Sequence, residues 1–198
     1  MQAEKVVLNL KAYLFLNKRP VLRGQDFSFV QEPVESYNNS MVGTPGITLR
    51  IYADTSVFGG VSDEEFEEPS KAFFDAIKKA RFILVTSELV RQEIQAGPKN
   101  VQELFSDILP ILDIAEITAE ALKLQRAYTD AGILSEQYST DALHVAIATV
   151  SQASLIVSWN FRHIVNFQKI PMYNAVNTLH GHREIAIYSP LEVIEYED

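Results

Sequence analysis

Three acidic residues stand where carboxylates could do chemistry. Asp54 directly follows an apolar run, Glu93 lies 39 residues further on, and Asp141 lies 48 residues after that. Carboxylates that converge on one spot repel each other unless a hard divalent cation lies between them. Mg²⁺ and Mn²⁺ prefer such oxygen ligands and keep open positions for water and phosphate oxygens. The pattern therefore suggests a metal site that acts on phosphate esters.

Each of these acids also has an ordinary structural interpretation. Asp141 opens an apolar stretch, and an aspartate in the first turn of a helix is favoured by the helix dipole alone. Glu93 competes with Glu88 for the middle position. The two glutamates are five residues apart, about 140° around a helix, so they cannot both face one site. The residue pattern does not choose between them.

Alternating strands and helices must position these acids. A helix from about Asp141 to Ser151, capped by Ser139 or Thr140, is apolar on most sides and should be buried. Strands are expected at 47–53, 81–86, 111–114, 154–158 and 184–188, and further helices from Pro69 onward and at 87–96, 100–109 and 118–131. Strands separated by helices require parallel connections. The sequence therefore predicts a three-layer α/β/α sandwich with a central, mainly parallel sheet, and Asp54 at a carboxyl strand end, where such sheets bind ligands.

Four runs of sequence carry a more specific resemblance. The runs YADTS (52–56), TSELVRQEI (86–94) and STDALHVAIA (139–148) resemble the successive acidic motifs of PIN domains, in the same order. The run LIVSWN (155–160) resembles the strand that carries the family's fourth acidic position. Within the family, the sequence is most similar to VapC-type toxins of prokaryotic toxin–antitoxin modules.

The resemblance implies a function and a set of residues. It implies that Asp54, Glu93 and Asp141 bind Mg²⁺ or Mn²⁺, and it selects Glu93 over Glu88 because Glu93 stands at the family's position in the helix. The implied reaction is metal-dependent hydrolysis of RNA phosphodiesters, in which the ion lowers the pKa of the attacking water. The implied partners are the RNA substrate, a small antitoxin protein that occupies the site, and a second copy of the chain in a homodimer.

The sequence departs from the family pattern at Asn160, where many PIN domains have a fourth carboxylate. An amide oxygen can still bind a metal, but it brings no charge. We therefore expect a second ion to bind more weakly, so that a one-metal mechanism becomes an alternative.

Polar residues next to the acids are expected to contact substrate. Thr55 or Ser56 would orient Asp54 or a phosphate, and Arg162 and His163 would contact phosphate or a leaving oxygen. His144, one turn after Asp141, is expected to pack within its helix rather than bind a ligand.

Composition limits the classes of protein to which the chain can belong. It has no cysteine, which removes disulfides, thiolate nucleophiles and zinc–cysteine sites and fits a reducing compartment. It has no apolar run of the roughly 18 residues that a membrane helix needs and no convincing signal peptide, so we expect a cytoplasmic protein without a membrane segment. Residues 51–198 carry 11 Lys and Arg against 22 Asp and Glu. This acidity argues against a broad basic surface for nucleic acid, although bound cations can invert the local field of a small site.

The first 45 residues differ from the rest. They contain three prolines and a polar stretch at 36–40, and apart from a strand or hairpin at 6–15 they are typical of a linker. We therefore expect an N-terminal extension or fusion at 1–45 and a PIN-like domain at 46–198.

Two other functions are alternatives. A catalytically weak or silent PIN-like module that binds RNA or a protein is suggested by Asn160 and the acidic composition. A phosphohydrolase of the haloacid dehalogenase type would need a second aspartate two residues after the first, where this sequence has Ser56.

Overall fold

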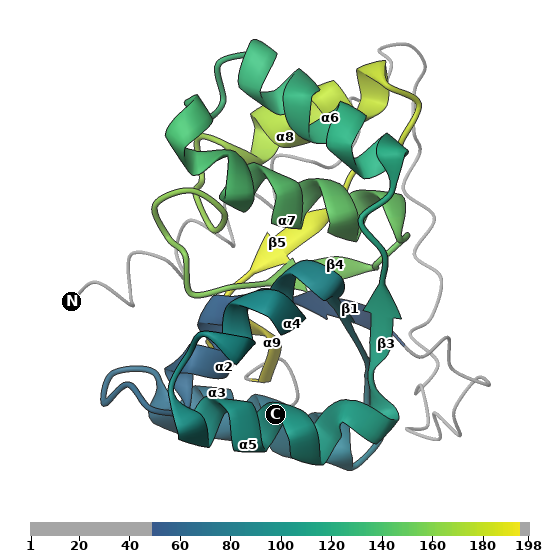
Figure 1. The fold of residues 1–198 in the computed structure, drawn as a ribbon. Coiled ribbons are helices and arrows are strands. Elements are labelled where there is room, and N and C mark those ends of the chain that lie inside the picture. Colours follow the sequence, from purple (N-terminus) through teal and green to yellow (C-terminus); the bar gives the residue numbers. More distant parts are fainter. Residues whose placement is uncertain (1–48, 195–198) are drawn as a thin grey trace, which may run out of the picture. The chain divides into compact units, whose positions relative to one another are not determined.

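The computed structural model describes residues 49–194, whose five strands form one parallel sheet (Figure 1). The spatial order of the strands is β3-β2-β1-β4-β5, and every neighbouring pair is parallel. The strands are β1 (Arg50–Ala53), β2 (Ile83–Ser87), β3 (Asp113–Ala115), β4 (Leu155–Val157) and β5 (Ala186–Tyr188). The prediction of an α/β fold around a parallel sheet is confirmed.

Helices cover both faces of this sheet. They are α2 (Thr55–Gly60), α3 (Glu67–Lys78), α4 (Glu88–Gln95), α5 (Lys99–Ile108), α6 (Ala119–Asp130), α7 (Ser139–Val150), α8 (Ile170–Leu179) and α9 (Pro190–Ile194), with short 3₁₀ turns at Leu109–Ile111 and Glu136–Tyr138. In Figure 1, α6, α7 and α8 lie on one side of the sheet and α3 and α9 on the other. The described residues thus form the expected three layers. No helix among them is long and apolar enough to cross a membrane.

The order of the strands creates a switch point beside β1. The chain runs outward from β1 through β2 to β3, and then returns to add β4 on the opposite side of β1. Open parallel sheets bind ligands where the strand order reverses in this way, outside the carboxyl ends of the strands. Because Ala53 pairs with Val157, the next residues, Asp54 and Ser158, leave the sheet side by side at this point.

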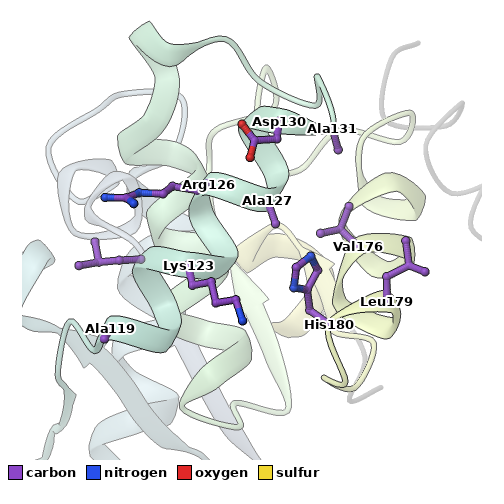
Figure 2. Close-up of a pocket in the computed structure, with 10 residues that line it drawn as sticks. Ala119, Lys123, Arg126, Ala127, Asp130, Ala131, Val176, Leu179 and His180 are labelled. Atoms are coloured by element: carbon purple, nitrogen blue, oxygen red, sulfur yellow. The ribbon is translucent and has the colours of Figure 1, made fainter.

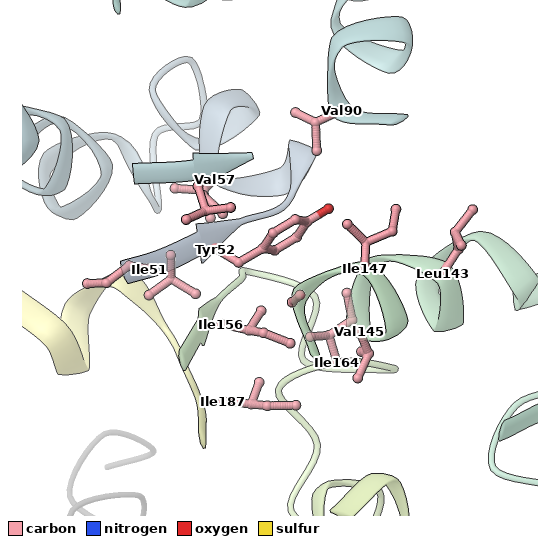
Figure 3. Close-up of a cluster of buried hydrophobic side chains, with 14 of the residues drawn as sticks. Ile51, Tyr52, Val57, Val90, Leu143, Val145, Ile147, Ile156, Ile164 and Ile187 are labelled. Carbon is pink, nitrogen blue, oxygen red and sulfur yellow. The ribbon is translucent and has the colours of Figure 1, made fainter. Parts of the chain in front are cut away.

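The core explains why β1 and α7 are so apolar. Ile51 and Tyr52 have no exposed surface although they face opposite sides of the sheet, as expected for a strand covered on both faces. Figure 3 shows Tyr52, Ile156 and Ile187 of neighbouring strands facing α7. Helix α7 has eight consecutive buried residues, from Ala142 to Thr149, which confirms its predicted burial.

Several helix ends differ from the expectations. Helix α3 begins at Glu67, so Pro69 is its third residue rather than its first. This is tolerated because the first four N–H groups of a helix have no partner within it. Helix α7 begins at Ser139 after Tyr138, without a side-chain cap, because the 3₁₀ turn at Glu136–Tyr138 already winds the chain before the helix starts. The predicted cap by Ser139 or Thr140 is therefore wrong.

Other ends were predicted correctly, and three helices were not predicted. Thr118 caps α6 by accepting a hydrogen bond from the Ala121 amide at 3.1 Å, and Gly132 follows the helix with φ +72°. Helices α2, α8 and α9 were not expected from the sequence. The predicted strand or hairpin at 6–15 and the proposed boundary near residue 45 lie outside the described residues.

Candidate functional site

Asp54 lies at the carboxyl end of β1 as a buried carboxylate, with 3% of its surface exposed. One carboxylate oxygen accepts a hydrogen bond from the Ser56 hydroxyl at 2.6 Å, and the other accepts one from the Ser158 hydroxyl at 2.8 Å. Burial raises the pKa of Asp54, and attraction to His144 and the two hydroxyl hydrogen bonds offset this only in part. Within residues 49–194, no lysine or arginine forms an ion pair with Asp54.

Glu93, on α4, reaches the residue next to Asp54. The Thr55 hydroxyl donates to Oε2 of Glu93, and Nε2 of His144 lies 3.2 Å from the same oxygen. Burial acts to raise the pKa of Glu93, but the hydrogen bonds from His144 and Thr55, with the attraction of His144, lower it overall. Glu88 instead pairs with Arg91 at 2.7 Å on the surface of the helix. The two glutamates therefore occupy different environments, and Glu93 is the one that contacts Thr55, the residue after Asp54.

His144 connects α7 to both β1 and α4. The residue is only 4% exposed, so the expectation that it packs inside is met, and its ring nitrogens also make polar contacts. Nδ1 lies 2.9 Å from the Tyr52 hydroxyl, which lies 2.9 Å from the Ser87 hydroxyl. Burial raises the pKa of Tyr52 and keeps the phenol neutral. A continuous polar path thus runs from Ser87 through Tyr52 and His144 to Glu93.

Asn160 holds the third acid. Its Nδ2 donates to Oδ1 of Asp141 at 3.1 Å, and its Oδ1 accepts from the His163 backbone amide at 3.0 Å. Because the carboxylate only accepts and the amide N–H only donates, these contacts fix the orientation of the side chain. The backbone amide of Asn160 also donates to the Ser158 hydroxyl at 2.9 Å. Asp141 is therefore linked to Asp54 through Asn160 and Ser158.

Of the predicted substrate-contacting residues, two contact site carboxylates and the other two, Arg162 and His163, lie against Tyr138. Thr55 and Ser56 hold carboxylates, Thr55 that of Glu93 and Ser56 that of Asp54. The Arg162 guanidinium lies 5.3 Å from the centre of the Tyr138 ring. His163 is buried with its ring 4.0 Å from that of Tyr138, and neither of its ring nitrogens has a hydrogen-bond partner among residues 49–194. Burial lowers the pKa of His163 despite the attraction of Asp141.

Sequence reasoning missed Ser158, Tyr52 and the bridging role of His144. Ser158 is separated from Asp54 by 104 residues and Tyr52 from His144 by 92, so no local pattern shows these contacts. One signal was available. His144 stands three residues after Asp141, and residues three apart lie on neighbouring positions of a helix surface.

Comparison with known proteins adds the family. Residues 51–164, which include all three acids and Asn160, match the family model described as the PIN domain. This chain belongs to the PIN domain family. Among solved structures, this chain is similar to a chain in the crystal structure of VapBC2 from Rickettsia felis. That structure contains a DNA fragment from the VapBC2 promoter. The identity is 16% and the TM-score 0.49, and the similarity covers 70% of this chain and 97% of that chain. No curated protein matches the chain.

The donor atoms at this edge of the PIN domain are all oxygens of the kind that Mg²⁺ and Mn²⁺ prefer. Within the described part of the chain, no group of three or more histidine or acidic side chains is gathered closely enough to hold an ion by itself. Magnesium commonly binds through one or two carboxylates and keeps several waters. The buried Asp54 carboxylate, which forms no ion pair with a lysine or arginine of residues 49–194, fits such an ion chemically.

A surface hollow of about 670 Å³ lies elsewhere in the described residues, between α6 and α8 (Figure 2). Its lining includes Lys123, Arg126, Asp130 and His180 together with apolar side chains such as Val176. None of the three acids lines it. The candidate site is therefore the edge at the β1–β4 switch point and not this hollow.

Proposed function

We propose that this PIN domain is a metal-dependent endoribonuclease with Asp54, Glu93 and Asp141 as its catalytic acids. The observation that carries the proposal is Asp54, a buried carboxylate with a raised pKa at the switch point of a parallel sheet. A buried charge without a cation is unfavourable. Carboxylates whose pKa is raised by burial concentrate at functional sites, and here the other two acids are tied to the same edge by hydrogen bonds.

The neighbouring side chains have defined roles in this proposal. Asp54, Glu93 and Asp141 would hold Mg²⁺ or Mn²⁺, with waters completing the coordination because the three acids are not gathered closely enough in residues 49–194 to hold an ion by themselves. The Asn160 carbonyl oxygen would join them only after the side-chain amide, which now donates to Asp141, turned over. When bound, the ion supplies charge stabilisation on the phosphate and a water of lowered pKa.

Each acid is held in place before substrate arrives. Ser56 and Ser158 hold Asp54, Thr55 and His144 hold Glu93, and the Asn160 amide holds Asp141. Groups oriented in advance need not be reorganised at the moment of reaction.

The VapC-like motif pattern supports a biological role. We propose that the protein is the toxin of a toxin–antitoxin module, with RNA as substrate, a small antitoxin as inhibitor and a homodimer as the assembly. Size-exclusion chromatography with light scattering tests the dimer, and a monomer across micromolar concentrations would contradict it.

The nuclease is tested with the full chain on labelled RNAs, both single-stranded and structured, in Mg²⁺, Mn²⁺ or EDTA. Cleavage should require the metal and fall at least about a hundredfold in Asp54→Asn and Asp141→Asn. Glu88→Gln is the matched control, because it removes a carboxylate from the same helix as Glu93 but at the surface pair with Arg91. It should cleave like the wild type.

One observation favours a second function, a silent PIN-like module that binds RNA or protein. The Asn160 amide satisfies Asp141 without any cation. If no RNA is cleaved and calorimetry detects no Mn²⁺ binding, the nuclease proposal fails and this module is the better account.

A further inference from the structure

Three aromatic side chains meet beside the candidate site. The rings of Phe66 and Trp159 are stacked, with centroids 4.4 Å apart and planes at 19°. Phe161 leans on both, with its centroid 6.0 Å from that of Trp159 and 6.3 Å from that of Phe66. Trp159 is almost buried, whereas Phe161 is 49% exposed. The cluster thus presents one aromatic ring to solvent and supports it from beneath with two others.

This aromatic cluster of Phe66, Trp159 and Phe161 is held firmly. The indole N–H of Trp159 donates to the Ser70 hydroxyl at 2.9 Å, and its backbone amide donates to the Ser56 hydroxyl at 2.8 Å. The ring also packs closely over Gly60, where an added Cβ would lie 2.7 Å from the indole nitrogen. The Trp159 ring, on which Phe161 leans, is therefore fixed by contacts that include Ser56, the residue that holds Asp54.

The aromatic cluster also adjoins the third acid. Asn160, between Trp159 and Phe161 in sequence, donates to Asp141. Arg162, the next residue, places its guanidinium over the Tyr138 ring. Within four consecutive residues the chain therefore presents a buried ring, an amide bound to a site carboxylate, an exposed ring and a cation.

The charge of the protein restricts how RNA could be bound here. The chain has a net charge of −9, which argues against a broad cationic groove that follows phosphates. Stacking of bases on aromatic side chains adds binding energy beyond phosphate contacts and tolerates any base sequence. A base can stack on a protein ring only when it is not already stacked in a duplex. An exposed ring beside a phosphate-cleaving site therefore fits unpaired nucleotides.

We propose that Phe161, supported by Trp159 and Phe66, stacks an unpaired base of single-stranded RNA, and that Arg162 contacts the adjoining phosphate. This inference rests on the proposed nuclease function and assigns a base-contacting residue to it, namely Phe161.

A binding experiment tests the stacking without any cleavage. The full chain is titrated, with Ca²⁺ in place of Mg²⁺, with a single-stranded RNA that carries 2-aminopurine and with the same strand annealed to its complement. Trp159 is the only tryptophan in the sequence, so its fluorescence reports on the aromatic cluster itself. We expect the single strand to quench 2-aminopurine and to change the Trp159 signal, and we expect the duplex to do neither.

Variants assign the effect to the ring of Phe161. Phe161→Leu should weaken single-strand binding about tenfold, in the range measured for loss of one stacked base, whereas Phe161→Tyr should bind like the wild type. Phe167→Leu is the matched control, because Phe167 is 71% exposed but lies outside the aromatic cluster. Thermal melting of each variant separates loss of binding from loss of folding.

Cleavage kinetics provide a second, separate result. Phe161→Leu should raise KM about tenfold and leave kcat within about twofold, and Phe161→Tyr should restore KM. If RNA is cleaved but Phe161→Leu matches the wild type in KM and in quenching, the stacking proposal is wrong while the nuclease stands. That outcome would leave a protein partner as the occupant of this surface. If the stacking signals appear but no metal supports cleavage, the proposed function fails instead.

Discussion

Asn160 donates its side-chain amide to Asp141 at a distance of 3.1 Å, while its carbonyl oxygen is engaged by the His163 backbone amide. An aspartate at position 160 would face Asp141 with a like charge, which disfavours ionisation of both groups when no cation is present. Because Asn160 is neutral, Asp141 does not need a cation to balance a second charge at position 160. In the absence of metal, Asp141 is satisfied by a neutral donor.

This relationship predicts opposite effects of Asn160→Asp on stability and on metal affinity. In EDTA the variant should be less stable than the wild type by about 1–2 kcal/mol, because two carboxylates meet. With Mn²⁺ it should recover that loss and bind the ion more tightly, since a charge is added. Thermal melts with and without Mn²⁺, together with calorimetry, measure both effects. A variant that is as stable as the wild type in EDTA would show that the two side chains do not interact.

The buried Asp54 predicts a pH-dependent gain in stability when its charge is removed. Its folded-state pKa is raised above the unfolded value. The stability contributed by protonated Asp54 is therefore complete below the ordinary carboxyl range, near pH 4, and is lost as pH rises through the folded-state pKa. Asp54→Asn does not suffer this loss, because one of the Ser56 and Ser158 hydroxyls can rotate to accept from the new NH₂ group while the other still donates to the remaining oxygen.

In EDTA, Asp54→Asn should accordingly be more stable than the wild type by about 1–3 kcal/mol at pH 8, and the difference should shrink as the pH falls toward 4. Urea unfolding at several pH values measures the difference. If the difference in stability between Asp54→Asn and the wild type stays constant with pH, it does not arise from the ionisation of Asp54.

His144 predicts a loss of metal binding from a residue that is not a proposed ligand. It holds Glu93 on one side and the Tyr52 hydroxyl on the other. His144→Ala should weaken Mn²⁺ binding about 10- to 100-fold, the range found when a residue that orients a ligand is removed. Tyr52→Phe keeps the imidazole in place and should mainly lower stability, by about 1–3 kcal/mol, since buried polar groups lose a partner. If His144→Ala binds Mn²⁺ as tightly as the wild type, His144 does not position a metal ligand.

Two adjacent glycines predict opposite effects of the same substitution. A Cβ at Gly60 would meet the Ser70 hydroxyl and lie 2.7 Å from the Trp159 indole nitrogen, whereas a Cβ at Gly59 would meet nothing within 4 Å. Gly60→Ala should destabilise the fold by about 1–3 kcal/mol through overpacking. Gly59→Ala should be neutral or stabilising by up to about 1 kcal/mol, because alanine is the better helix former. Chemical unfolding compares the two variants, and a similar loss in both would contradict the packing argument.

Much of the framework could be predicted from the sequence because its signals are local. The apolar run before Asp54 identifies a buried strand, the apolar character of Ala142–Thr149 identifies a buried helix, and alternation of the two types requires a parallel sheet. The order of the acids along the chain then identifies the PIN pattern that the family comparison shows. Helix α2 was not predicted because its local sequence signal is weak. Its two glycines are poor helix formers, and the helix forms because Val57 and Phe58 are fully buried in the core.

The sequence by itself therefore determined the strands, the buried helix and the order of the acidic residues, since each depends on neighbours within a few positions. Only the tertiary structure decided which side chains meet. It places Glu93 against Thr55 and His144 while Glu88 pairs with Arg91. It also joins Asp54 to Ser158 across 104 residues of sequence and Tyr52 to His144 across 92. Such contacts depend on strand order and side-chain direction in three dimensions, which no periodicity along one chain encodes.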